Sequence, residues 1–170
     1  QSIGSLYESF TDFLGFQPDA DEWKVMGMAA YGDADRFRKK AESLVELQGN
    51  GKYELDLNYF NFNNFDVPGH YTNKLIDLLG EPRSKNNKIN QRHFDLAATA
   101  QELFEKVLFH CVRYLHDITG EANLCLSGGS AMNSLANGKI QDATPFDNVF
   151  IPYAPDDSGL AIGSALHLYH

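Results

Sequence analysis

Apolar residues recur at helical spacing along most of this chain. In residues 3–15 they lie three and four positions apart, and Gly15 closes the segment, so the pattern predicts a helix. Further helices are predicted over 21–31, 33–47, 71–80 and 92–119. The last of these carries a continuous apolar stripe that ends at Gly120, which indicates a central packing helix.

Alternation with period two replaces this spacing after a turn at 48–51. The segment KYELDLNYF (52–60) alternates apolar and polar residues and predicts a half-buried strand. Residues 61–69 are expected to form a loop or a short edge strand, and 80–90 form a polar connector.

From residue 122 onward the elements alternate between strand and helix. We predict a βαβα unit over 122–170, made of a strand at 123–127, a helix at 130–140, a strand at 148–152 and a helix at 157–168. The two strands of such a unit are parallel, so both following loops lie at one edge of the sheet. Residues 127–130 and 152–159 should therefore face each other across a common cleft, where ligands bind in open α/β sheets.

Composition limits the class of protein. A chain of 170 residues that is 43% hydrophobic can bury a real core, and we expect residues 1–170 to form a single nucleotide-binding lobe. The 14 basic and 23 acidic residues give a net charge of −9, which argues against binding to nucleic acid or an anionic membrane. Without an apolar run of membrane-spanning length or a signal pattern at the start, the sequence predicts a cytoplasmic protein. Cys111 and Cys125 each lie in an apolar element, so we expect buried, inert thiols.

The segment NLCLSGGSAMNSLANG (123–138) carries the most informative pattern. A short apolar run meets Gly128 and Gly129, followed by small residues from Ser130, which is how a chain presents backbone N–H groups to a phosphate. Asn133 should lie one helical turn further on, where its amide can reach a base, ribose or phosphate. The alternative is that the glycines serve only the geometry of the turn.

The second loop contains adjacent carboxylates at a helix start. Asp156 and Asp157 precede Ser158 and Gly159, and hard oxygen ligands beside a polyphosphate suit a divalent cation. The simpler interpretation is an N-cap, because Asp is a preferred capping residue. We include Gly159 among the predicted nucleotide contacts and Asp157 as the predicted metal ligand.

Residues 21–27 offer a further set of polar side chains. Lys24 can neutralise phosphate charge, and Glu22 or Asp21 can hold a ribose hydroxyl. The alternative is that these are solvated helix residues around buried Val25 and Met26.

Together these segments resemble the carbamoyltransferases of antibiotic and Nod-factor biosynthesis. The resemblance covers nearly the whole chain and rests on five segments: SIGSLYESFTDFLGF (2–16), DEWKVMGMAAYG (21–32), FDLAATAQELFEKVL (94–108), LCLSGGSAMNSLANGKI (124–140) and IPYAPDDSGLAIGSAL (151–166). It implies the second half of a domain related to actin, sugar kinases and the tRNA threonylcarbamoyl-transferring enzyme. The fold expected is an α/β, ribonuclease-H-like lobe with a mixed sheet flanked by helices.

The same resemblance implies an activity. Family members form carbamoyl-adenylate from ATP and carbamoyl phosphate and pass the carbamoyl group to an acceptor hydroxyl. Gly128, Gly129 and Asn133 match the nucleotide-contacting segment, and Asp157 matches the carboxylate of an iron-type metal site that also uses two histidines of an H-x-x-x-H motif. That motif does not occur in this chain.

Because the sequence opens on Gln1, we expect a piece of a longer protein, inactive alone, whose upstream lobe supplies the histidines and whose downstream domain binds the acceptor. One alternative is a small-molecule kinase or ATPase lobe of the same fold, with magnesium at Asp157. Another is a nucleotide-binding module without catalysis.

Overall fold

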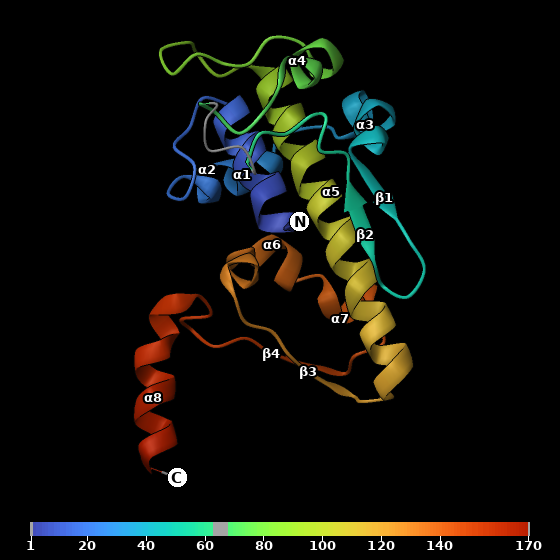
Figure 1. Cartoon of the computed structure of the whole chain (residues 1–170), viewed down its shortest axis with the longest axis vertical. Coiled ribbons are helices and arrows are strands. Elements are labelled where there is room, and N and C mark those ends of the chain that lie inside the picture. Colours follow the sequence, from blue (N-terminus) through green and yellow to red (C-terminus); the bar gives the residue numbers. More distant parts are fainter. Residues whose placement is uncertain (1, 63–67, 170) are drawn as a thin grey trace. The chain divides into compact units, whose positions relative to one another are not determined.

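The computed structural model describes residues 2–62 and 68–169, which divide into two compact units, 1–111 and 112–170. Figure 1 shows helices together with two small sheets of two strands each. This mixture agrees with the predicted α/β class, while the ribonuclease-H-like lobe stays a prediction. No helix of the described residues is long and apolar enough to span a membrane.

The helices of the first unit follow the predicted apolar spacing. Ser2 caps α1 by accepting the N–H of Gly4, and Gly15, with φ 70°, follows its end in the left-handed conformation. The buried faces of α1 and α5 include Leu6, Phe10 and Phe104. Five helices of the predicted set are present, at α1 Ile3–Phe13, α2 Glu22–Ala29, α3 Asp35–Ala41, α4 Asn73–Leu79 and α5 Gln91–Thr119, the last of which continues into the second unit.

The predicted helix 33–47 is wrong beyond Ala41. A 3₁₀ turn, η1 Glu42–Leu44, leads into β1 Val45–Leu47, which pairs antiparallel with β2 Tyr53–Leu55. Val45 and Leu55 face each other and are both buried, so packing of the hairpin outweighs helix propensity.

The predicted strand 52–60 is also shorter than expected. It ends at Leu55 because Asp56 accepts the N–H of Asn58 through its side chain, which closes a local turn. Phe60 forms an isolated antiparallel bridge with Tyr71, and residues 63–67 of the predicted loop lie outside the described part of the chain.

A buried carboxylate joins α5 to α3 and to the segment before it. Asp95 is only 3% exposed; it accepts the N–H of Asp33 at 2.9 Å and a guanidinium N–H of Arg36 at 2.9 Å. Burial alone raises the pKa of Asp95, but these donors and the amide of Gln91 outweigh it, so the pKa lies below its ordinary value. The carboxylate is thus held ionised inside the unit.

Arg83 anchors the polar connector between α4 and α5. Its Nε donates to the carbonyl of Leu14 at 2.6 Å, Nη2 donates to that of Gly15, and Nη1 donates to three carbonyls within the connector itself. The guanidinium also lies over the ring of Phe16, 4.7 Å from its centroid. One buried side chain therefore fixes both the end of α1 and the start of the connector.

The second unit is built on a parallel pair of strands. β3 Asn123–Cys125 pairs with β4 Asn148–Phe150 in the predicted parallel sense, with Leu124 opposite Val149. The remaining elements are η2 Gly129–Met132, α6 Ser134–Asn137, α7 Ile140–Ala143, η3 Asp157–Gly159 and α8 Leu160–Tyr169. The helix predicted at 157–168 is confirmed apart from its first 3₁₀ turn.

The predicted strands 123–127 and 148–152 each end two residues early, and the predictions for the helix 130–140 and for the cysteines are wrong. The helix expected at 130–140 is three short segments, because Asn133 has ψ 89° and cannot continue a helix through position 133. Cys125 is exposed, since side chains alternate along β3 and only Leu124 of that strand is buried, whereas Cys111 is half-buried.

We predict that Arg83→Lys lowers the free energy of unfolding by about 2–4 kcal/mol, because an ammonium cannot reach carbonyls on both sides of the site at once. Arg38→Lys is the matched control: Arg38 bonds the exposed carboxylate of Glu102, and its loss should cost less than about 1 kcal/mol. Urea denaturation of both variants measures the difference. Equal destabilisation would contradict the anchoring role of Arg83.

Candidate functional site

The two loops predicted to meet at the edge of the parallel sheet are in contact. The ladder continues past the strands as Leu126 N–H donates to Phe150 at 3.0 Å, and Gly128 N–H then donates to the carbonyl of Pro155 at 2.6 Å. The loops after β3 and β4 are thus joined backbone to backbone, as the parallel topology requires. A ligand cleft between them remains a prediction.

The two adjacent glycines have different reasons to be glycine. Gly128 has φ 100°, which side-chain-bearing residues rarely adopt. Gly129 has an ordinary φ, and a Cβ added there meets no atom within 4 Å. The backbone conformation therefore explains why residue 128 is glycine. It does not explain Gly129, which has open space beside it.

The turn that follows presents two unused donors. Ala131 N–H bonds back to Gly128, but within residues 2–62 and 68–169 the N–H groups of Gly129 and Ser130 donate no hydrogen bond. Because η2 is only four residues long and the predicted helix 130–140 is interrupted, no long helix dipole points at this turn within the described residues. What the turn offers an anion is this pair of N–H groups at an exposed glycine.

Asn133 does not lie one turn inside a helix as expected. It caps α6: its Oδ1 accepts the N–H of Ala136 at 3.0 Å, and the residue is 9% exposed. Part of its amide therefore serves the local fold, and its predicted contact with nucleotide stays untested.

Tight backbone packing explains the glycine of the second loop. A Cβ on Gly159 would lie 2.3 Å from the carbonyl oxygen of Ala154, so no side chain fits. Gly159 N–H donates to the carbonyl of Asp156 at 3.0 Å. The predicted role of Gly159 in nucleotide binding thus has a structural alternative.

The adjacent carboxylates differ in their surroundings. Asp156 accepts the hydroxyl of Ser158 at 2.5 Å and makes no capping bond through its side chain. Asp157 is exposed, and its carboxylate has no hydrogen bond or ion pair to the described residues. The N-cap interpretation of this pair gains no support, and Asp157 is available as an oxygen ligand.

A metal site is not complete within the described residues. Three or more His, Cys, Asp or Glu side chains do not gather anywhere in that part of the chain in a way that could hold an ion. Asp157 fits a metal as a single hard ligand, and the remaining ligands would have to come from outside the described residues.

Glu22 and Lys24 belong to the first unit, whereas the other predicted site residues belong to the second. Lys24 pairs with Asp21 at 2.7 Å and lies beside the rings of Phe16 and Trp23. The hydrogen bond from Lys24, followed by one from Gln17 N–H, lowers the pKa of Asp21. Glu22 accepts the N–H of Asp19, so both predicted residues have local structural partners.

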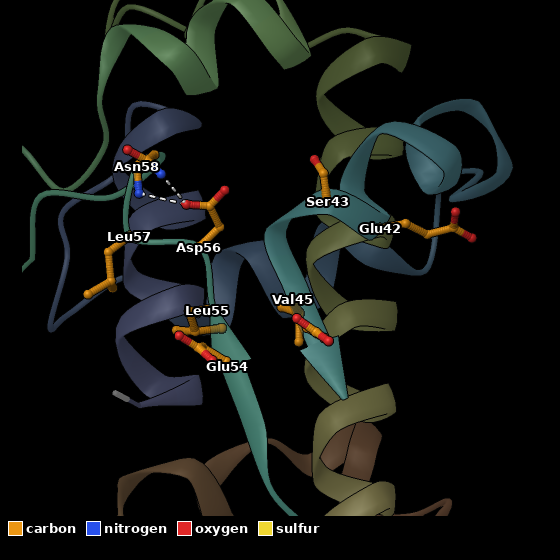
Figure 2. Close-up of a pocket in the computed structure, with 9 residues that line it drawn as sticks. Glu42, Ser43, Val45, Glu54, Leu55, Asp56, Leu57 and Asn58 are labelled. Carbon is orange, nitrogen blue, oxygen red and sulfur yellow. Dashed lines mark hydrogen bonds between the residues drawn. The ribbon is translucent and has the colours of Figure 1, made fainter. Parts of the chain in front are cut away.

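A hollow of about 700 Å³ lies at the open end of the β1–β2 hairpin in the first unit, and the residues predicted to bind nucleotide do not line it. In Figure 2, Glu42 and Ser43 lie on one side of this hollow and Asp56, Leu57 and Asn58 on the other, and Val45 and Leu55 lie where the two strands pair. Asn58 bonds to Asp56 on its own side of the hollow. The sequence pattern did not single out this hollow.

Comparison with known families decides the membership of the chain. The model described as "Carbamoyltransferase N-terminus" matches residues 1–166. The chain belongs to this family. It is 36% identical to "Nodulation protein NolO" of Bradyrhizobium diazoefficiens, across 97% of the chain and 28% of that protein. It is 37% identical to "Nodulation protein NolNO" of Sinorhizobium fredii, across 97% of the chain and 22% of that protein.

A similar relation holds outside the nodulation proteins. The chain is 38% identical to "Uncharacterized protein sll1178" of Synechocystis sp., over 99% of the chain and 27% of that protein. The chain thus spans roughly a quarter of the length of these curated relatives.

The sequence prediction missed one polar residue that contacts the glycine turn. Asn137 donates from Nδ2 to the carbonyl of Ala131 at 2.7 Å and so contacts the glycine turn from α6. The available signal was its position four residues after Asn133, which places both side chains on one helical face.

We predict that Gly159→Ala destabilises the protein by about 1–3 kcal/mol, because its Cβ overlaps the carbonyl of Ala154. Gly129→Ala, where a Cβ has open space, should change stability by no more than about 0.5 kcal/mol. Thermal and urea unfolding of both variants provide the measurement. A large loss of stability in Gly129→Ala would show that the turn itself requires this glycine.

Proposed function

We propose that this domain binds ATP for carbamoyl-adenylate formation in an O-carbamoyltransferase. The observation that carries the proposal is the pair of N–H groups at Gly129 and Ser130, which lack partners in the described residues and belong to a carbamoyltransferase-family chain. They stand on a turn tied to the loop that contains Asp157. A polyphosphate is an anion that such donors bind well.

In this proposal the chain contributes binding and orientation. The backbone donors of Gly129 and Ser130 hold a phosphate group, and the open space at Gly129 lets that group approach the main chain. Orienting the nucleotide against carbamoyl phosphate reduces the entropy cost of bringing the two reactants together. The described residues around the turn include no activated nucleophile, so the proposed chemistry relies on positioning and electrostatics.

A divalent metal, of iron type or magnesium, is the proposed cofactor beside ATP, and Asp157 is its proposed ligand from this chain. When bound, such an ion supplies positive charge that stabilises the phosphate groups. The exposed carboxylate of Asp157 lacks a described partner, which supports this role. Two further histidine ligands are proposed to come from an upstream lobe of a longer protein.

The transfer half of the reaction is proposed to take place with a hydroxyl-bearing acceptor bound by a downstream domain. Relatives several times longer than this chain support a division of labour between domains. We accordingly propose that the 170-residue chain alone does not complete the reaction, and that the protein acts in the cytoplasm without nucleic acid or membrane partners.

The test is ATP turnover by the complete gene product. We expect conversion of ATP only when carbamoyl phosphate is present, and Gly129→Val should weaken ATP binding at least tenfold, because a branched side chain occupies the space of the phosphate. Gly163→Val is the matched control, since Gly163 also has open space around it and lies in α8.

Calorimetry gives the ATP affinity and denaturation gives the stability of each variant. Turnover of ATP that needs no carbamoyl phosphate would favour a kinase or ATPase. ATP affinity that Gly129→Val leaves unchanged would overturn the proposed role of the turn.

A second prediction concerns the metal. Asp157→Asn in the complete gene product should lower the metal content and carbamoyl-adenylate formation while the fold stays intact, because the amide keeps the shape but loses the anionic ligand. Asp142→Asn, at another exposed carboxylate of the second unit, should leave both unchanged. Elemental analysis and adenylate formation are measured on the same samples. Wild-type metal content in Asp157→Asn would rule out its role as ligand.

A further inference from the structure

A side chain at the end of α6 contacts the glycine turn. Asn133 caps this helix through Ala136, and Asn137, one turn later, donates from Nδ2 to the carbonyl of Ala131 at 2.7 Å. Ala131 in turn donates its N–H to the carbonyl of Gly128 at 2.9 Å. A continuous series of hydrogen bonds therefore runs from Asn137 to the residue where the turn begins.

The carbonyl of Ala131 accepts its hydrogen bond from a side chain, the amide of Asn137. Asn137 therefore stabilises the turn as well as ending α6. Gly128 is fixed from the other loop by Pro155, so the turn is held at its start by the backbone and at Ala131 by Asn137. Gly129 and Ser130 lie between these two attachment points. The direction in which their N–H groups point depends on both.

The side-chain oxygen of Asn137 makes no competing hydrogen bond within the described residues. Its Oδ1 is buried and has no hydrogen-bond partner among the described residues, so the contact with Ala131 is the polar interaction that the chain makes with this side chain. A reversed amide would set Oδ1 against the carbonyl of Ala131, where two acceptors repel. The orientation of the amide is thereby fixed by the turn it supports.

We propose that Asn137 is a positioning residue for nucleotide binding: it holds the Gly128–Met132 turn so that the N–H groups of Gly129 and Ser130 converge on a phosphate. This inference rests on the proposed function and adds a residue that touches no ligand itself. It acts through the carbonyl of Ala131.

Asn137→Leu tests the proposal in the complete gene product. Leucine keeps the branched shape and removes both the donor to Ala131 and the unpartnered acceptor, so the losses and gains in folding stability offset each other. We expect ATP to bind about tenfold more weakly, and the buried amide of Ala131, which donates to the carbonyl of Gly128, to exchange hydrogen faster in the free protein. Asn148→Leu is the matched control, because Asn148 bonds Asn123 at the opposite end of the parallel strands.

Asn137→Asp adds a readout that a loss of packing would not produce. Its ionised carboxylate cannot donate to Ala131, whereas the protonated acid can, so ATP affinity should recover as the pH is lowered from about 7 to about 5 relative to the wild type. Unfolding curves at each pH give the folded fraction of each protein, so that ATP affinities are compared for folded protein alone.

The outcomes separate the two proposals. Unchanged hydrogen exchange in Asn137→Leu, or unchanged ATP affinity while Gly129→Val loses binding, overturns the role of Asn137 and leaves the proposed function standing. Failure of the wild-type protein to bind ATP overturns the proposed function. Hydrogen exchange at Ala131 then decides by itself whether Asn137 positions the turn.

Discussion

The hydrogen bond from Gly128 N–H to the carbonyl of Pro155 is the contact on which the candidate site depends. Parallel pairing of β3 with β4 brings the two loops to the same edge, and this bond then joins one loop directly to the other. To donate it, the chain turns at Gly128 with φ 100°. The donors that follow and the loop bearing Asp157 are therefore parts of one arrangement, although 27 positions separate Gly128 from Pro155 in the sequence.

Much of this arrangement could be predicted because it follows from periodicity. The apolar stripe of α5 and the alternation of strand and helix after residue 122 reflect burial, which the pattern of apolar residues records directly. Membership of the carbamoyltransferase family follows from motifs spread over the chain and is confirmed across residues 1–166. Each of these features depends on many residues, so one side chain with an unexpected partner does not make the prediction wrong.

The wrong predictions arise where one side chain competes with the local pattern. Asn133 bonds its own helix and breaks the expected segment 130–140, and Asp56 closes a turn that ends β2 early. Val45 was predicted in a helix but lies in a strand, because pairing with Leu55, ten residues later, buries it. Such outcomes depend on which hydrogen-bond partner a side chain finds, and spacing alone does not encode that choice.

The anchoring of Arg83 also restricts how the chain can vary in length. The connector after α4 is polar and contains no helix or strand, features that usually mark a segment tolerant of insertion. Here the guanidinium bonds to the carbonyls of Ser84, Lys85 and Asn87, and an added residue among them would draw at least one carbonyl away. Relatives that keep this arginine and differ in connector length should place the extra residues between position 87 and the start of α5.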